Sequence, residues 1–241
     1  MTDYTPRPDP EVLKRWPVSS WEWPRIIVYV PLLPAMPYAD EVFPHFWAIA
    51  QQGVPFLPTK FGCIDAARNR AAEALLISEF THILMLDGDQ KHPVDIVQRL
   101  ARHVIADPER LVVAGIYHNR RPPFAPLAWR VDHEQLTHAQ MVDYQPGRLE
   151  VDAAAAGCML VDRRVFERIE RPWFYHSYEG VQEAKAEFNY PTEDIGFCVK
   201  LFEAGIGITL DTTVNSPHAA TTWIDRAAML AYQQAEANRD A

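Results

Sequence analysis

The segment Thr81-His82-Ile83-Leu84-Met85-Leu86 constrains the fold of this chain more than any other part of the sequence. It is a nearly continuous apolar run, and it ends abruptly at Asp87-Gly88-Asp89. A strand of this composition is usually buried on both faces, which places it in the centre of a parallel sheet. The run therefore predicts an α/β fold with two carboxylates at the carboxyl end of a central strand.

The segments around this strand alternate between strand and helix patterns. Further strands are predicted at 26–30, 54–57 and 111–117, and helices at 40–51, 64–78 and 93–105. Such alternation is typical of a mostly parallel sheet flanked by helices and joined by right-handed crossovers. Beyond residue 120 the pattern predicts loops and short strands, a small-residue segment at 151–161, a helix at 195–202, a strand at 206–210 and a tail helix at 222–237.

Composition and charge exclude several classes of protein. The 32 acidic and 23 basic residues give a net charge of -9, which argues against broad non-specific binding to nucleic acid or anionic membranes. The three cysteines are far apart and form no CxxC, so neither a zinc finger nor a disulfide scaffold is expected, and a reducing compartment fits. No apolar run approaches the roughly 20 residues that cross a bilayer, and the N-terminus does not read as a signal peptide. We expect a soluble cytoplasmic protein.

The acidic pair Asp87 and Asp89 is the first candidate for chemistry. Ligands of open α/β sheets bind beyond the carboxyl ends of the strands. Two carboxylates separated by one glycine can both reach one hard cation such as Mg²⁺ or Mn²⁺. The alternative is an ordinary Asp-Gly turn after a strand.

Three other groups could contribute to the same edge of the sheet. Thr192-Glu193-Asp194 opens a helix; capping and the helix dipole explain these residue types, but one carboxylate could also act as a general base. His218 could complete a metal site with Asp89 or be an ordinary structural histidine. Arg68 and Arg70, near the start of a helix, could hold a diphosphate or form a solvated basic patch.

The remaining signals are negative. His82 lies inside the central strand and is expected to be structural, and the histidines at 92, 103, 133 and 138 follow no ligand spacing. The chain has no GxGxxG, no GxxxxGK[ST] and no GxSxG. Dinucleotide-binding, P-loop and α/β-hydrolase functions therefore lack their sequence fingerprints.

The order of these segments resembles the GT-A glycosyltransferases, in particular the small family-2-like enzymes of bacteria and phages. The matching segments, within residues 25–220, are IIVYVP, AARNRAAEALL, ILMLDGD, AAGCMLVDRRVF, TEDIGFCVKLFEAG and a late SPH. The resemblance implies a GT-A domain with a nucleotide-sugar half at 25–120 and an acceptor half at 121–220. An arm at 1–24 would precede it, and a C-terminal helix at 221–241 would follow.

The resemblance also implies a cofactor and a metal site. Mn²⁺ or Mg²⁺ would bind to Asp89 and His218, and Asp87 would contact the ribose or reach the metal through water. The ion would bridge the diphosphate of a UDP- or GDP-sugar and neutralise the leaving group.

Other residues receive roles in the same way. Arg68, with Asp65 nearby, would assist on the nucleotide side, and Gly157 would allow a close approach to the sugar. Asp194 or Glu193 would take the proton from the acceptor hydroxyl. The aromatic segment 171–191 would be a lid or an acceptor platform.

Several alternatives stay open. A nucleotidyltransferase would use a similar sheet and metal, and a binding module could keep the fold without turnover. The acidic residue that usually contacts the base has no obvious counterpart after 54–57, so the nucleotide is undetermined. The anomeric outcome and the acceptor are also open, although the negative charge disfavours a nucleic-acid acceptor.

Overall fold

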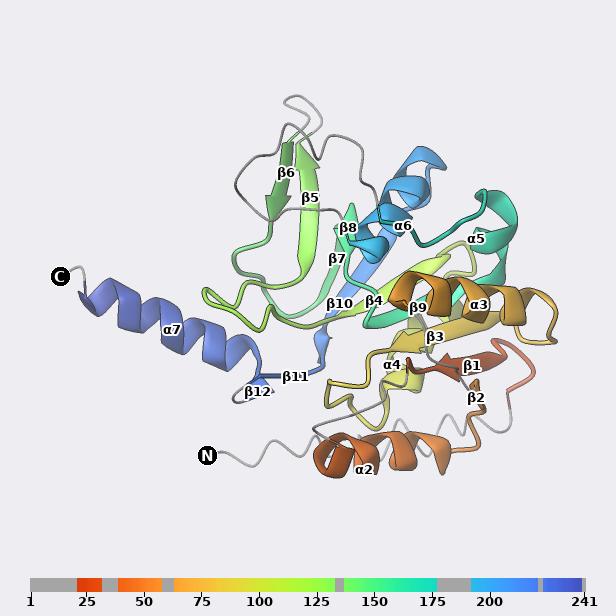
Figure 1. The fold of residues 1–241 in the computed structure, drawn as a ribbon, viewed down its shortest axis with the longest axis horizontal. Helices are drawn as coiled ribbons and strands as arrows, with labels where there is room; N and C mark the ends of the chain where they lie inside the picture. Colours follow the sequence, from red (N-terminus) through yellow and green to blue (C-terminus); the bar gives the residue numbers. More distant parts are fainter. Residues whose placement is uncertain are drawn as a thin grey trace.

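The computed structural model describes residues 21–31, 39–57, 63–132, 137–176, 192–220 and 223–239. A seven-stranded sheet forms its centre, with the strand order β2-β1-β3-β9-β4-β10-β7 (Figure 1). The strands of this sheet are β1 (Ile26–Tyr29), β2 (Phe56–Leu57), β3 (His82–Leu86), β4 (Val112–Ile116), β7 (Arg148–Val151), β9 (Cys158–Asp162) and β10 (Ile208–Asn215). The first 20 residues of the expected arm and most of the aromatic segment 171–191 lie outside the described residues, and the domain boundaries stay predictions.

The direction of the strands confirms the predicted α/β class. Strands β2, β1 and β3 are parallel to one another, and β4 is parallel to β10. Because β9 is antiparallel to both β3 and β4, those two neighbours also run in the same direction. Only β9 and β7 run against the others, so the sheet is mostly parallel in the sense that the sequence predicts.

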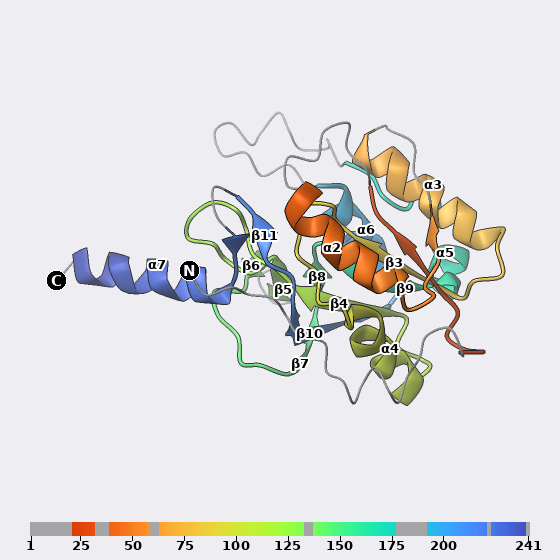
Figure 2. The same ribbon diagram turned by 90° about the horizontal axis from the view of Figure 1, so that it is seen from below.

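Helices cover both faces of the sheet (Figure 2). One apolar core packs α3, α5 and α6 against the sheet, and the other packs α2 and α4 against the opposite face. The bounds are α2 (Ala39–Ala50), α3 (Ile64–Leu76), α4 (Ile96–Ala106), α5 (Arg163–Arg168) and α6 (Glu193–Glu203). None of the helices in the described part of the chain is long and apolar enough to cross a bilayer.

Strand β3 is the buried central strand that the apolar run predicts. Ile83 and Met85 project into the core with α3, α5 and α6, while Leu84 and Leu86 project into the core with α2 and α4. All four side chains are almost completely buried. The absence of hydrophobic alternation in the sequence thus reflects burial on both faces.

The structure differs from the predicted elements mainly in the second half of the chain. The small-residue segment at 151–161 provides the end of β7, the short β8 (Ala153–Ala154) and all but the last residue of β9. Strand β9 inserts between β3 and β4, a non-local pairing that no sequence period signals. Strand β10 begins at Ile208 and continues to Asn215, beyond the predicted end at residue 210.

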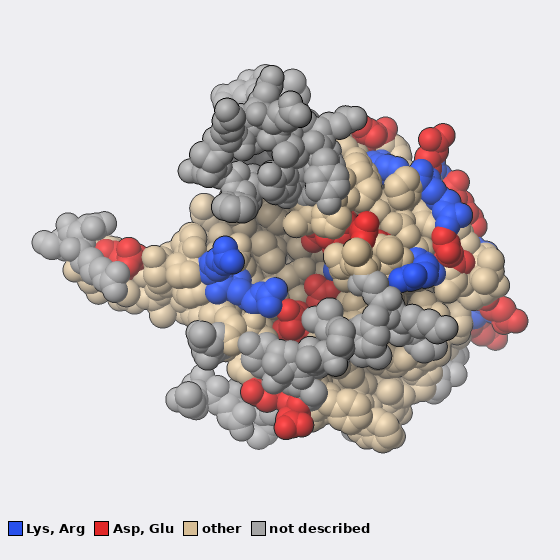
Figure 3. Space-filling model, viewed as in Figure 1, with Lys and Arg blue, Asp and Glu red and all other residues tan. Residues whose placement is uncertain are grey.

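Three smaller parts complete the fold. Strands β5 (Ala128–Asp132) and β6 (Thr137–Gln140) form a small sheet with β8, and β11 (His218–Ala219) pairs with β12 (Trp223–Ile224). The predicted tail helix is α7 (Arg226–Arg239), which projects away from the rest of the structure (Figure 1). The face seen in Figure 3 carries acidic side chains around a hollow near its middle, with a group of basic side chains beside the hollow.

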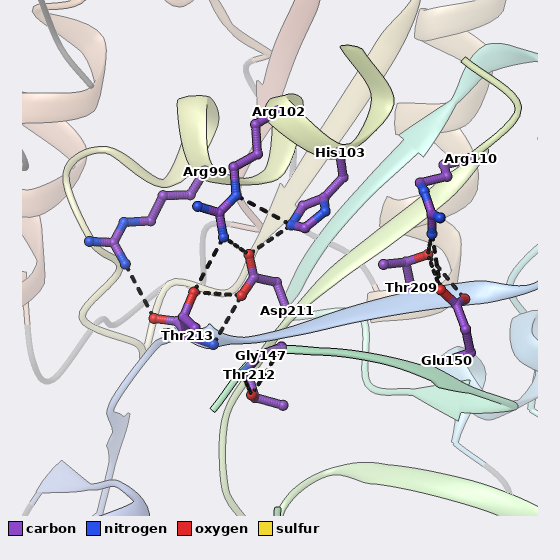
Figure 4. Close-up of polar contacts among 10 residues, drawn as sticks. All are labelled: Arg99, Arg102, His103, Arg110, Gly147, Glu150, Thr209, Asp211, Thr212 and Thr213. Carbon is purple, nitrogen blue, oxygen red and sulfur yellow. Dashed lines mark hydrogen bonds and ion pairs between the residues drawn. The ribbon is translucent and has the colours of Figure 1, made fainter. Parts of the chain in front are cut away.

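A buried carboxylate anchors β10 to α4 (Figure 4). Asp211 is 1% exposed and accepts hydrogen bonds from Arg102 Nη2 at 2.5 Å, His103 Nε2 at 2.7 Å and Thr213 N at 3.0 Å. Burial alone would raise the pKa of Asp211, but these hydrogen bonds and the charge of Arg102 hold it well below its ordinary value. The Asp211 carboxylate is therefore ionised in the folded protein near neutral pH.

We expect Asp211→Asn to lower the free energy of unfolding by about 2 to 4 kcal/mol at pH 7, because it removes the buried charge that pairs with Arg102 and accepts the other hydrogen bonds. Since the folded-state pKa is depressed, this stabilisation is present above pH ~4 and is lost as the pH falls further. Urea unfolding at pH 7 and pH 3 measures both effects.

Glu150 offers a matched control, because it also pairs with an arginine next to β10 but its side chain is 60% exposed. Glu150→Gln should cost less than about 1 kcal/mol. Equal urea midpoints for Asp211→Asn and the parent protein at pH 7 would contradict the importance of the buried carboxylate.

Candidate active site

The predicted acidic pair lies directly after β3, where a second segment of chain meets it. Lys91 N donates to the carbonyl of Pro217 at 2.9 Å, and Ala219 N donates to the carbonyl of Asp89 at 2.9 Å. Between these bonds, Gln90 and His218 form an antiparallel bridge. This backbone contact brings Asp89 and His218 together although they are far apart in the sequence.

The side chains of Asp89 and His218 face each other. His218 Nε2 lies 3.4 Å from Asp89 Oδ2. His218 Nδ1 lies 2.9 Å from the carbonyl oxygen of His118, which can only accept, so Nδ1 carries the proton. In the neutral ring Nε2 therefore presents its lone pair to the carboxylate, and a cation or a second proton is needed between the two acceptors.

Asp89 Oδ2 has a further cationic neighbour. Arg120 Nη1 lies 3.1 Å from the same oxygen. Burial would raise the pKa of Asp89, but a His218 ring protonated on both nitrogens, through its hydrogen bond and charge, and the charge of Arg120 together lower it. The oxygen that faces His218 is therefore held in its ionised form.

His92 links the segment after β3 to the segment after β10 through hydrogen bonds of its buried ring. Its ring is completely buried, with Nε2 3.0 Å from the carbonyl oxygen of Asp87 and Nδ1 3.0 Å from Ser216 Oγ. The carbonyl oxygen requires a proton on Nε2, so Nδ1 accepts from the serine hydroxyl. Burial lowers the pKa of His92 to about 4, which keeps the ring neutral in this arrangement.

His92 has no predicted role, because its spacing in the sequence matches no metal-ligand pattern. The signal that could have found it is its position in the turn directly after the acidic pair. A buried polar side chain there must find partners in the adjoining segments.

Arg68 joins the acidic pair to the start of α6. Its guanidinium, 3% exposed, pairs with Asp87 Oδ1 through Nη2 at 2.9 Å and with Glu193 Oε1 through Nη1. Burial raises the pKa of both carboxyl groups against the opposing effect of Arg68, with Asp89 adding to the rise for Asp87 and Asp194 for Glu193. The predicted contact of Arg68 with a nucleotide stays a prediction. In the structure Nη1 and Nη2 pair with the two carboxylates, and the buried Nε has no hydrogen-bond partner among the described residues.

The two acidic residues of α6 have different surroundings. Glu193 is buried against Arg68, whereas Asp194 is partly exposed. Asp194 Oδ1 accepts from Ile195 N at 2.9 Å and from the hydroxyl of Thr192, and its Oδ2 lies 3.4 Å from Ala156 N. Thr192 occupies the N-cap position without capping the helix through its side chain. Of the two candidate bases, Asp194 is the one that solvent can reach.

Gly157 lies directly behind Asp87. Its carbonyl accepts from Asp87 N at 2.9 Å, and its amide donates to the hydroxyl of Tyr117 at 3.0 Å. A Cβ atom at this position would lie 2.5 Å from Asp87 Oδ2, 2.5 Å from Gln90 Nε2 and 2.7 Å from the Tyr117 hydroxyl. Glycine is required here for the packing of the acidic pair, a reason that the sequence did not suggest.

The structure thus brings most of the predicted site residues to one edge of the sheet. Asp87, Asp89, His218, Arg68, Glu193, Asp194 and Gly157 belong to one network of contacts through the bonds given above. Asp65, in the first turn of α3, is half-buried, and its Oδ1 is buried without a hydrogen-bond partner among the described residues. Arg70 is exposed on α3. Neither is joined to Asp87 by a contact in the described part of the chain.

We expect Gly157→Ala to destabilise the fold by about 1 to 3 kcal/mol, because the added methyl group overlaps polar atoms of Asp87, Gln90 and Tyr117. Gly207→Ala is the matched control, since nothing lies within 4 Å of its added Cβ. Urea unfolding of both variants tests the difference. A Gly157→Ala protein as stable as the Gly207→Ala protein would show that the pocket behind Asp87 is loose.

No family model matches the sequence, and no curated protein is similar to it in sequence. Among solved structures, A197 from STIV is similar over 83% of this chain and 86% of its own length, with 15% identity and a TM-score of 0.58. A CMP:2-keto-3-deoxy-manno-octonic acid synthetase complexed with CTP shares 15% identity over 90% of this chain and 100% of its own, with a TM-score of 0.46. GalNAc-T7 with UDP, GalNAc and Mn²⁺ shares 11% identity over 80% of this chain and 37% of its own, with a TM-score of 0.48. The first similarity shows a shared fold, and the other two are too low to support a conclusion.

Proposed function

We propose that this chain is a metal-dependent glycosyltransferase that transfers a hexose or pentose from a UDP- or GDP-sugar to an acceptor hydroxyl. The observation that supports the proposal most directly is the pair of facing acceptors, Asp89 Oδ2 and His218 Nε2, 3.4 Å apart. The nucleotide-sugar donor is inferred from the order of sequence segments, which resembles that of the GT-A enzymes. The pair also lies beyond the carboxyl end of β3, which is where ligands of open α/β sheets bind.

The residues present fit a divalent cation. Two ligands in neighbouring positions around Mg²⁺, each about 2.1 Å from the ion, lie about 3 Å from each other, so Asp89 and His218 are close to a suitable separation. Among the described residues, no group of three or more His, Cys, Asp or Glu side chains is close enough to form a preformed metal cage. Mg²⁺ usually retains several water ligands and binds substrate phosphates in addition to one or two protein ligands. A site with two protein ligands is consistent with this coordination.

The site residues divide the remaining tasks. A bound cation would neutralise the negative charge that develops on the leaving diphosphate. Asp87 would contact the ribose or a water on the metal, held in place by Arg68 and Gly157. Arg68 would then act on the nucleotide side through Asp87. Asp65 belongs to the same side of the site in this proposal.

Asp194 is the proposed general base. Its carboxylate is partly exposed at the start of α6, and its Oδ2 lies 3.4 Å from the backbone nitrogen of Ala156, the residue before Gly157. Glu193 is bound to the buried guanidinium of Arg68 and so serves to position it. Asp194 would take the proton from the acceptor hydroxyl as that oxygen attacks the sugar in an inverting displacement.

The first test is metal-dependent nucleotide binding. We expect UDP or GDP to raise the melting temperature only when Mn²⁺ is present, because the ion joins protein and diphosphate. Asp89→Asn and His218→Gln should abolish the increase. Glu79→Gln, a change at an exposed residue before β3 and so at the opposite end of that strand from the acidic pair, should leave it intact. A parent protein that shows no increase with either nucleotide would refute the proposed function.

The second test separates the two carboxylates of α6. We expect Asp194→Asn to lower sugar transfer by about 10²-fold or more with little change in melting temperature, since it removes a general base at a partly exposed position. Glu193→Gln should instead lower the melting temperature, because Arg68 loses a buried partner.

Analysis of the products distinguishes sugar transfer or donor hydrolysis from the pyrophosphate release of a nucleotidyltransferase. Full activity in Asp194→Asn would remove this residue from the mechanism.

A further inference from the structure

The loop between β4 and β5 carries an arginine to the entrance of the site. Residues 117–127 form a hairpin-like loop, closed by hydrogen bonds from Leu127 N to the carbonyl of Tyr117 and from Asn119 N to the carbonyl of Ala125, both 2.9 Å. A turn bond from Phe124 N to the carbonyl of Arg121, also 2.9 Å, shapes its tip. The loop is therefore held by its own backbone, and Arg120 projects from a defined position.

Arg120 occupies the side of Asp89 that a cation would use. Its Nη1 lies 3.1 Å from Asp89 Oδ2, the same oxygen that faces His218 Nε2 at 3.4 Å. The Arg120 side chain is 53% exposed, so the pair is a weak, water-screened one that is readily exchanged. A divalent ion bound to Asp89 and His218 would lie next to the Arg120 guanidinium, and the two positive charges would repel each other.

A nucleoside diphosphate resolves this conflict. Its phosphate oxygens would lie next to the ion, within the reach of an exposed guanidinium on the same side of Asp89. Arginine matches phosphate with two parallel hydrogen bonds and is always charged. The carboxylates around it, Asp87, Asp89 and Asp194, would otherwise repel the diphosphate.

We propose that Arg120 is a phosphate-binding residue of this site and that it exchanges partners, from Asp89 in the free protein to the diphosphate of the bound nucleotide. This inference rests on the proposed function, and it adds a consequence of its own. The guanidinium disfavours binding of the metal alone and favours binding of the metal together with the nucleotide. Because such coupling is reciprocal, each ligand strengthens the binding of the other.

The test measures two affinities that should change in opposite directions. In Arg120→Gln, Mn²⁺ alone should bind about two- to fivefold more tightly, because the exposed guanidinium that competes for Asp89 is gone. UDP or GDP at saturating Mn²⁺ should bind about tenfold more weakly or worse, because the charged hydrogen bonds to phosphate are lost. The electron paramagnetic resonance signal of free Mn²⁺ measures the first affinity, and titration calorimetry measures the second.

Two further variants serve as controls. Arg121→Gln removes the same charge from the next residue of the loop, whose side chain is also exposed, and should change both affinities by less than about twofold. Arg120→Lys keeps the charge but loses the forked geometry, so the affinity for Mn²⁺ should stay near that of the parent protein while nucleotide binding falls less than in Arg120→Gln.

The outcomes separate this inference from the proposed function. If Arg120→Gln weakens both affinities, or leaves both unchanged, the exchange of partners is wrong even though the parent protein binds metal and nucleotide. Equal effects of Arg120→Gln and Arg121→Gln would show that Arg120 acts only through the net positive charge of the loop. That result would also overturn the proposed exchange of partners. A parent protein that binds neither Mn²⁺ nor Mn²⁺ with nucleotide overturns both proposals together.

Discussion

The short antiparallel contact between residues 89–91 and 217–219 determines where the polar side chains of the site lie. It consists of two backbone hydrogen bonds and one bridge, yet it joins the end of the central strand to a segment that follows the last strand of the sheet. His92 secures the same junction through Asp87 and Ser216. Because these backbone bonds fix the register, the main chain determines which residues of the two segments lie next to each other.

A second constraint is the buried charge on Arg68. A guanidinium that is almost completely removed from water requires anionic partners, and Asp87 and Glu193 supply them. Such an arrangement adds little net stability compared with an apolar core, because desolvation offsets most of the attraction. Its effect is positional: it holds one acidic residue of the site and the start of α6 at fixed places relative to α3.

The sequence predicts the parts of this protein that depend on local pattern. The apolar run of β3, the carboxylates after it and the helix that begins at Glu193 can all be found from residue order, since burial and capping act over a few residues. The facing of Asp89 and His218 followed from a family resemblance, and the structure places them side by side. The insertion of β9 between β3 and β4 could not be predicted, because strand pairing between distant segments has no local period. For the same reason His92 and Tyr117 escaped notice: their contacts join segments that meet only in the folded chain.

The loop at 117–127 carries two unrelated features of the site on one backbone. The carbonyl of His118 sets the proton position of His218, and two residues later Arg120 reaches Asp89. An insertion or deletion within those few residues would disturb both at once. Changes elsewhere on the surface would leave this arrangement intact, so we expect the length of this loop to vary little among relatives that keep the site.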